Sequence, residues 1–298
     1  MKIGQEPLIS VVVPVHMMAG KLQNLEKTLE ESQASNLPIQ YLLVHDGDDQ
    51  GTAEELRSFV ERYSAEYHQV KFESPGLTRN YGLNFARAPW ITFWDSDDLG
   101  EPKRLYSAVS IVPKDKAVVI GGFKIHSVTS GVTTDIQRPE RNLSSLMLNP
   151  GSWRFVFRKN YIGDVRFPSF SMGEDQVFLA QLNMKESEVE YIDDYFYTYF
   201  KGSDSQLTMK VESIAQVPKA ILEVEDFILR EKVVERYLYV LNARLAFTAL
   251  KYRGYSIFKF VSYFVGNSKL DRRKRFYWIL GFIQVSKFLI FNSRHGNQ

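Results

Sequence analysis

The sequence contains no cysteine. This absence excludes disulfide bonds, thiolate metal sites and cysteine nucleophiles, and it fits a cytosolic protein. Charge of one sign is also lacking, since the formal net charge of the 298 residues is only +2. No strong overall field would therefore attract a polyanion, and we expect no nucleic-acid partner.

Several catalytic signatures are missing as well. The chain has no Gly-rich phosphate loop and no nucleophile elbow, and its five histidines show no metal-ligand spacing. Its first apolar run is a short strand rather than the core of a signal peptide. Near the C-terminus, the 16-residue stretch 276–291 is interrupted by Gln284 and Lys287. That stretch is too short and too polar to predict a membrane-spanning helix.

Alternation of strands and helices dominates the first part of the chain. Strands are predicted at 8–15, 40–44, 70–72, 91–94 and 117–123, and helices at 22–32, from Thr52, at 77–87 and at 103–112. Thr52 to Glu55 reads as a capping box. This order predicts an α/β fold with a mostly parallel, Rossmann-like sheet and helices on both faces. Beyond it the pattern predicts strands at 153–158, 189–192 and 195–200, and a helix at 176–184. From residue 211 onward the chain reads as helical.

The most informative stretch is Trp90–Asp98, in which an apolar strand ends in Asp95, Asp97 and Asp98. Acids at the carboxyl end of a strand lie where open α/β sheets bind ligands. Two carboxylates spaced Asp-x-Asp suit a divalent cation and its phosphate or sugar. The alternative is an acidic turn in which Asp98 caps the next helix.

Three further polar sites follow strands or open helices. Asp46 follows the second strand, Arg79 lies in the segment Pro75–Gly82, and Glu174 with Asp175 precedes a predicted helix. For the last pair, the alternative role is to stabilise the start of that helix.

Taken in order, the motifs VVVPV, VHDGDD, GLTRNYGL, WDSDD and GED resemble those of family 2 glycosyltransferases of the GT-A fold. The resemblance covers roughly residues 8–208. It departs from the family at the second motif, which usually reads Asp-Asp-Gly-Ser. Here His45 replaces the first acid and Asp48 replaces the serine.

The resemblance implies a role for each site residue. It makes Asp97 the ligand of a divalent cation, Mn²⁺ or Mg²⁺, and Asp95 a contact of the ribose or sugar, with Asp98 orienting the loop. The acid at position 46 would contact the nucleotide base. Arg79 would add positive charge near the base or diphosphate, unless it is only an exposed helix charge. The implied donor-binding set is Pro14, Val15, Asp46, Arg79, Asp95 and Ser96.

For the acceptor, the resemblance implies a general base that inverts the anomeric centre. Asp175 matches that base, and Glu174 is the close competitor. Relatives often carry a Tyr-Arg-x-His-type segment after the last strand, where this chain has Thr198 and Phe200. Lys201 is a candidate replacement for that charge. The segment Ser203–Thr208 is a candidate lid.

The C-terminal part combines a basic run, residues 269–275, with the aromatic stretch 276–291. On a helix, Tyr277, Gly281, Gln284 and Lys287 would form a narrow polar stripe. Together with the aromatic and basic stretch 252–264, this pattern favours the surface of an anionic membrane. The alternative is a helix packed on the catalytic domain or on a partner.

The resemblance implies an inverting glycosyltransferase that uses a nucleotide-diphosphate sugar, with a UDP-sugar the first expectation. The acceptor would be a glycan or a lipid-linked carrier in surface-polysaccharide synthesis, on the inner face of the cytoplasmic membrane. Residues 1–208 would form the catalytic domain, with a donor half up to about residue 100, and residues 209–298 a helical extension. The alternatives are a sugar-phosphate nucleotidyltransferase and a non-catalytic module that binds nucleotide or glycan.

Overall fold

The computed structural model describes residues 6–202, 213, 215–231, 234–253 and 270–295. These residues fall into two compact units. The first contains the described residues of 1–139, 151–171 and 187–206, and the second those of 140–150, 172–186 and 207–298. The predicted domain boundary at 208, the predicted lid Ser203–Thr208 and most of the stretch 252–264 lie outside the described residues.

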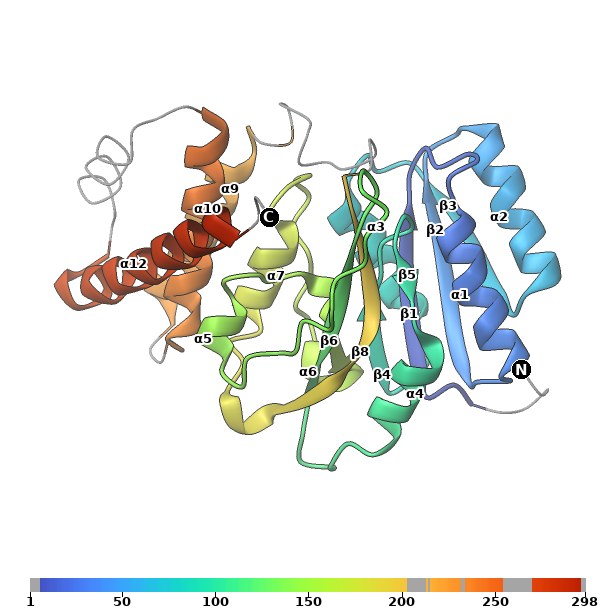
Figure 1. Ribbon diagram of the computed structural model, residues 1–298, viewed down its shortest axis with the longest axis horizontal. Coiled ribbons are helices and arrows are strands. Elements are labelled where there is room, and N and C mark those ends of the chain that lie inside the picture. Colours follow the sequence, from blue (N-terminus) through green and yellow to red (C-terminus); the bar gives the residue numbers. More distant parts are fainter. Residues whose placement is uncertain (1–5, 203–212, 214, 232–233, 254–269, 296–298) are drawn as a thin grey trace. The chain divides into compact units, whose positions relative to one another are not determined.

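An eight-stranded sheet forms the centre of the first unit (Figure 1). Its strands are β1 (Ile9–Val15), β2 (Ile39–Asp46), β3 (Ala65–Val70), β4 (Trp90–Phe93), β5 (Leu99–Gly100), β6 (Val118–Ser127), β7 (Phe155–Arg158) and β8 (Val189–Lys201). The spatial order is β3-β2-β1-β4-β7-β6-β8-β5. Strands β3, β2, β1 and β4 are parallel, as the alternation of strands and helices predicts. Strand β7 is antiparallel to β4 and to β6, so the complete sheet is mixed.

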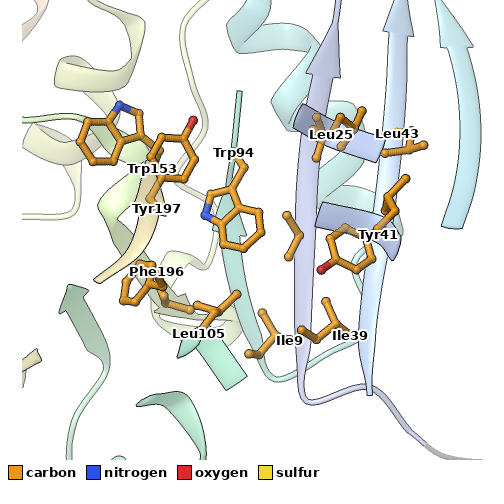
Figure 2. Packing of buried hydrophobic residues seen from close by; sticks show 14 of the residues in the cluster. Ile9, Leu25, Ile39, Tyr41, Leu43, Trp94, Leu105, Trp153, Phe196 and Tyr197 are labelled. Carbon is orange, nitrogen blue, oxygen red and sulfur yellow. The ribbon is translucent and has the colours of Figure 1, made fainter. Parts of the chain in front are cut away.

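Helices cover both faces of this sheet. They are α1 (Gln23–Ala34), α2 (Gln50–Arg62), α3 (Pro75–Phe85), α4 (Pro102–Ser110) and α6 (Lys159–Ile162), with the 3₁₀ turn η1 (Ser152–Arg154). Odd-numbered residues of β1 such as Val11 join one apolar cluster with Leu25 of α1 and Phe59 of α2. Figure 2 shows part of this cluster. On the opposite face, Gly82 of α3 packs directly over Val12. The period-two alternation of β1 thus supplies both layers of the core.

The second unit is helical in its described part. It contains α5 (Leu143–Leu146), α7 (Glu174–Gln181), α9 (Val217–Arg230), α10 (Tyr237–Arg253) and α12 (Arg272–His295), and the 3₁₀ turn η2 (Glu186–Glu188) lies between the units in sequence. Helix α12 packs on α10 through the buried side chains of Trp278, Phe282 and Val285. Gly281 is buried too. An added Cβ would lie 3.0 Å from the backbone of Tyr239, so α12 and α10 lie close together at this point. Of the predicted polar stripe, Gly281 is therefore buried, whereas Tyr277 and Gln284 are half-buried and Lys287 is exposed.

Three local predictions differ from the structure. Helix α2 begins at Gln50, before the predicted capping box, because the Asp49 carboxylate accepts a hydrogen bond from the amide of Thr52. The third strand ends at Val70, where a start was predicted. The two strands predicted at 189–192 and 195–200 are one strand, β8, which runs past a bulge opposite Gly121 and Gly122. Pairing with neighbouring strands decides the two strand boundaries, and the pattern of a single strand does not contain that pairing.

Helix α3 can lie close to the sheet only because residue 82 is glycine. A Cβ at this position would lie 2.4 Å from Cγ1 of Val12. We expect Gly82→Ala to lower the free energy of unfolding by about 1–3 kcal/mol, as overpacking does. This loss would exceed the gain of roughly 1 kcal/mol in helix propensity. Urea unfolding followed by circular dichroism measures the change.

A double-mutant cycle with Val12→Ala isolates the cause. If the close approach is responsible, Gly82→Ala costs less stability in the Val12→Ala background than in the wild type. A variant Gly82→Ala that is more stable than the wild type would contradict the proposed contact.

Candidate active site

The carboxyl ends of β1, β2 and β4 meet at one edge of the sheet. Strand β1 lies between β2 and β4, and all three run parallel. From β1 the chain continues to β2 and β3 on one side, and then returns to β4 on the other side of β1. The carboxyl ends of β1 and β4 therefore form the switch point at which open α/β sheets bind ligands. Most of the residues predicted to hold the donor lie at these three strand ends.

The acidic loop, Asp95–Asp98, leaves the end of β4. Asp95 forms an ion pair with Arg79 of α3, with 2.9 Å between Oδ1 and Nη2. The guanidinium of Arg79 is buried and also stands over the ring of Phe167, 5.5 Å from its centroid. Arg79 is therefore no exposed helix charge, and the alternative considered for it is wrong. The ion pair brings together two of the predicted donor-binding residues.

Asp98 points into the protein and is 3% exposed. Its two carboxyl oxygens accept hydrogen bonds from the hydroxyl of Tyr197 (2.7 Å) and the backbone amide of Phe200 (2.6 Å), both on β8. Burial, followed by repulsion from Asp97 and Asp95, raises the pKa of Asp98 well above its usual value. Helix α4 has Glu101 at its N-cap, so Asp98 does not cap that helix. Its two hydrogen bonds join the loop to β8, and its predicted role in orienting the loop stays a prediction.

Asp97 and Ser96 occupy the middle of the acidic loop. Ser96 is buried and Asp97 is half-buried. The backbone carbonyl of Asp97 accepts a hydrogen bond of 2.9 Å from the side-chain amide of Asn24 on α1. Among the described residues, no three His, Asp or Glu side chains gather into a site that could hold a metal ion.

The carboxylate of Asp46 has a structural task at the end of β2. Oδ1 accepts from the amides of Phe72 (2.6 Å) and Glu73 (3.0 Å). Oδ2 accepts from the amide of Ser74 (3.0 Å) and the hydroxyl of Thr78 (2.8 Å). These four bonds hold the connection between β3 and α3, and thereby the start of the helix that carries Arg79. The predicted contact of Asp46 with a nucleotide base stays a prediction.

The other strand-end residues divide between core and surface. The side chain of Val15 belongs to the core cluster, and Pro14 is half-buried beside it. His45 is fully buried and contacts Asp49 (2.9 Å) and the hydroxyl of Tyr67 (3.2 Å). The histidine that replaces the usual acid thus connects β2 to α2 and β3.

Glu174 and Asp175 form the first turn of α7 in the second unit. Gly173 precedes them with φ +85°, and an added Cβ would lie 2.8 Å from that of Ala220. Glycine is required there for both reasons. Glu174 is 6% exposed, and Asp175 accepts a hydrogen bond from the amide of Gln176. This position fits stabilisation of the helix start, and the catalytic role of either acid stays a prediction.

Strand β8 provides the region in which relatives carry an additional charged group. Thr198 is buried, and the backbone of Phe200 is bonded to Asp98. Lys201 is exposed at the end of the strand. Its proposed role as a replacement cation is untested.

Sequence reasoning missed the residues that hold the acidic loop and the following Gly100 in place: Asn24, Thr28 and Tyr197. It also missed Thr78, whose hydroxyl donates to Asp46. Asn24 and Thr28 are four residues apart on one face of α1, and Thr28 exchanges hydrogen bonds with Gly100 (3.0 Å from its amide). The sequence did contain a signal for Asn24 and Thr28, because they are polar residues at helical spacing beside the apolar face of a predicted helix. Tyr197 lies in a run of aromatic residues and carries no such signal.

A mixed α/β sheet with helices on both faces and an acidic loop at the switch point defines the GT-A class. The family model described as "Glycosyl transferase family 2" matches residues 10–178. The chain belongs to this family, and it is a glycosyltransferase.

Individual relatives are distant. Glycosyltransferase GlyG of Streptococcus pneumoniae serotype 4 is 25% identical over 238 residues, covering 73% of this chain and 78% of the relative. The poly(ribitol-phosphate) beta-N-acetylglucosaminyltransferase TarS of Staphylococcus aureus is 21% identical over 247 residues, covering 79% and 41%.

Solved structures share the fold at low identity. A crystal structure of S. aureus TarS in complex with UDP-GlcNAc superposes with a TM-score of 0.60 at 17% identity, covering 93% of this chain and 81% of that one. The mannosyltransferase PcManGT of Pyrobaculum calidifontis, in complex with GDP-Man and Mn²⁺, gives 0.54 at 13% identity, covering 95% and 87%.

The hydrogen bonds of Asp46 make a prediction about stability. We expect Asp46→Asn to lower the free energy of unfolding by about 2–4 kcal/mol, because an amide NH₂ would face donors and leave buried groups without an acceptor. Urea unfolding of the purified protein measures this loss.

Asp48→Asn is the matched control two residues away. The side chain of Asp48 is 79% exposed and pairs with Lys71 at the surface, so its loss should leave stability unchanged. Equal effects of both substitutions would show that the four bonds of Asp46 do not stabilise the connection between β3 and α3.

Proposed function

We propose that this glycosyltransferase transfers a sugar from a nucleotide-diphosphate sugar, bound at the carboxyl ends of β1, β2 and β4, to an acceptor hydroxyl. The observation that carries this proposal is the acidic loop at the switch point, where Asp95 is paired with a buried arginine. Asp97, two residues after Asp95 in the same loop, is half-buried. A UDP-sugar is the first donor to test, since the TarS neighbour binds UDP-GlcNAc.

A divalent cation, Mn²⁺ or Mg²⁺, fits this loop. Mg²⁺ and Mn²⁺ prefer oxygen ligands, and one or two carboxylates plus substrate phosphates are sufficient for Mg²⁺. We propose that Asp97 holds the cation and that Asp95 contacts the ribose or sugar. The cation would stabilise the negative charge that develops on the leaving diphosphate. The Mn²⁺ complex of the mannosyltransferase neighbour supports this choice.

The nucleophile would be a hydroxyl of the acceptor, activated by a general base. Asp175 is the proposed base and Glu174 its competitor. Loss of the hydroxyl proton to the carboxylate as the oxygen attacks the anomeric carbon would release the nucleoside diphosphate and invert that centre.

For the acceptor, we propose a glycan or lipid-linked carrier in surface-polysaccharide synthesis. Relatives named for such tasks support this, among them TarS and the minor teichoic acid biosynthesis protein GgaA of Bacillus subtilis, 25% identical over 66% of this chain and 48% of the relative. Membership in a glycosyltransferase family favours this assignment over a nucleotidyltransferase or a non-catalytic module.

The test separates donor binding from turnover. With UDP-sugars and Mn²⁺, we expect release of UDP that a chelator abolishes. Asp97→Asn should weaken donor binding, because it removes the proposed cation ligand. Asp175→Asn should keep donor binding and lower turnover by a factor of about 100 or more. Calorimetry measures binding, and a coupled assay measures released UDP.

Glu174→Gln is the comparison for the base, since this acid lies one residue away in the same helical turn. If it abolishes turnover while Asp175→Asn does not, Glu174 is the base. Absence of both binding and hydrolysis with a panel of nucleotide sugars, with and without metal, would refute the donor assignment.

We further propose that α12 attaches the protein to an anionic membrane surface. Among the described residues, no helix has the length and apolar character needed to cross a membrane. Three apolar side chains of α12 are nevertheless exposed: Phe276 (58%), Ile279 (40%) and Ile283 (44%). The exposed Arg272, Arg273 and Lys287 flank them along the helix. An apolar stripe with cations at both ends is complementary to an anionic bilayer.

Substitution of this stripe tests the attachment without disturbing the buried face of α12. We expect the triple variant Phe276→Ser, Ile279→Ser, Ile283→Ser to reduce binding to vesicles that contain phosphatidylglycerol by about tenfold or more, because apolar area is lost. Flotation in a density gradient measures the bound fraction.

Ile111→Ser is the control, because Ile111 is 77% exposed but lies at the end of α4 in the first unit. Its binding should equal that of the wild type. Undiminished flotation of the triple variant, or equal binding to neutral vesicles, would exclude α12 as the anionic-membrane anchor.

A further inference from the structure

One hydroxyl group connects both ends of the acidic loop. The hydroxyl of Tyr197 accepts a hydrogen bond from the amide of Asp95 (3.1 Å) and donates one to Oδ2 of Asp98 (2.7 Å). The loop also closes on itself, since the amide of Asp98 lies 3.4 Å from the carbonyl of Asp95. Asp97 is therefore held on a turn whose two ends are fastened to the same atom.

The ring that carries this hydroxyl is fixed by its neighbours. Tyr197 is fully buried and stacks on Trp153, with 4.7 Å between ring centroids and planes 9° apart. Trp94, the residue before the acidic loop, lies on its other side with centroids 6.0 Å apart. Figure 2 shows the three rings together in the core. Since the ring is packed on both sides, the direction of the hydroxyl is determined by the core.

Helix α1 holds the loop from another direction. Asn24 donates to the carbonyl of Asp97 (2.9 Å), and Thr28, one turn later, accepts from the amide of Gly100 (3.0 Å). Strand β5 then pairs Gly100 with Tyr197 itself. The carbonyl of Asp97 and the amide of Gly100 are thus both bonded to α1.

We propose that Tyr197 and Asn24 are positioning residues, which hold the acidic loop in its metal-binding shape before the donor arrives. This inference rests on the proposed function of Asp97 as the cation ligand. Neither side chain would contact the reacting atoms. Their effect is to remove the need to order the loop when the cation and diphosphate bind, which strengthens binding without a new contact.

The variant Tyr197→Phe tests the role of the hydroxyl, because it keeps the packed ring. In the protein without ligands, we expect the amide of Asp95 to exchange with deuterium about tenfold faster, since its acceptor is lost. We also expect the affinity for Mn²⁺ in the presence of UDP to fall about tenfold, while the affinity for UDP in a chelator stays within about twofold. Mass spectrometry and calorimetry give these values.

Tyr41→Phe is the matched control. Tyr41 is also a buried tyrosine of this sheet, but no hydrogen bond joins its hydroxyl to the acidic loop. It should bind Mn²⁺ with wild-type affinity. Asn24→Ala provides a second variant on α1, and it should weaken Mn²⁺ binding in the same direction even if Tyr197→Phe folds poorly.

The outcomes separate this inference from the proposed function. If the wild type binds Mn²⁺ with UDP and both variants bind it equally well, the positioning role is refuted and the function stands. Equal weakening in Tyr41→Phe would also refute it, because the effect would then be general. A wild type that binds no Mn²⁺ in the presence of UDP would overturn both the cation site and the inference.

Discussion

The burial of the Asp98 carboxyl is the constraint from which the geometry of the site follows. A carboxyl group removed from water beside two other acids is costly unless its oxygens are hydrogen-bonded. Tyr197 and the amide of Phe200 supply those bonds, and both belong to β8, a distant strand of the sheet. Because one acid is turned inward and satisfied, the loop turns where it does, and Asp95 and Asp97 remain at the sheet edge.

The acids of the site therefore have different tasks, although the sequence shows them alike. Asp46 uses four hydrogen bonds to hold the connection that leads into α3. Asp95 is paired with the arginine on that helix. The charge of Asp95 is thus balanced within the protein, whereas Asp97 is proposed to meet a cation. The hydrogen bonds of Asp46 and Asp98 and the ion pair of Asp95 thus fix the surroundings of Asp97, the proposed cation ligand.

Part of this was predictable. Strands β1, β2 and β4 and helices α1 to α4 follow from hydrophobic periodicity, whereas β3 was misplaced and β5 was not predicted. The acids at strand ends follow from their order. The antiparallel placement of β7 was not predictable, since strand pairing depends on contacts distant in sequence. The same limit applies to Arg79, whose burial depends on Phe167 and Asp95. On α12, periodicity showed a helix, but packing on α10 decided which apolar residues are buried and which are exposed.

By itself, the sequence determined the alternation of elements, the absence of thiol chemistry and the family-like order of motifs, because these depend on neighbours along the chain. Tertiary structure alone decided which of the three acids after Trp94 is buried and which is paired with Arg79. Their positions depend on a tyrosine 99 residues after Asp98 and on an asparagine 73 residues before Asp97. No local pattern contains such pairs, since hydrogen bonds form between groups that only folding brings together.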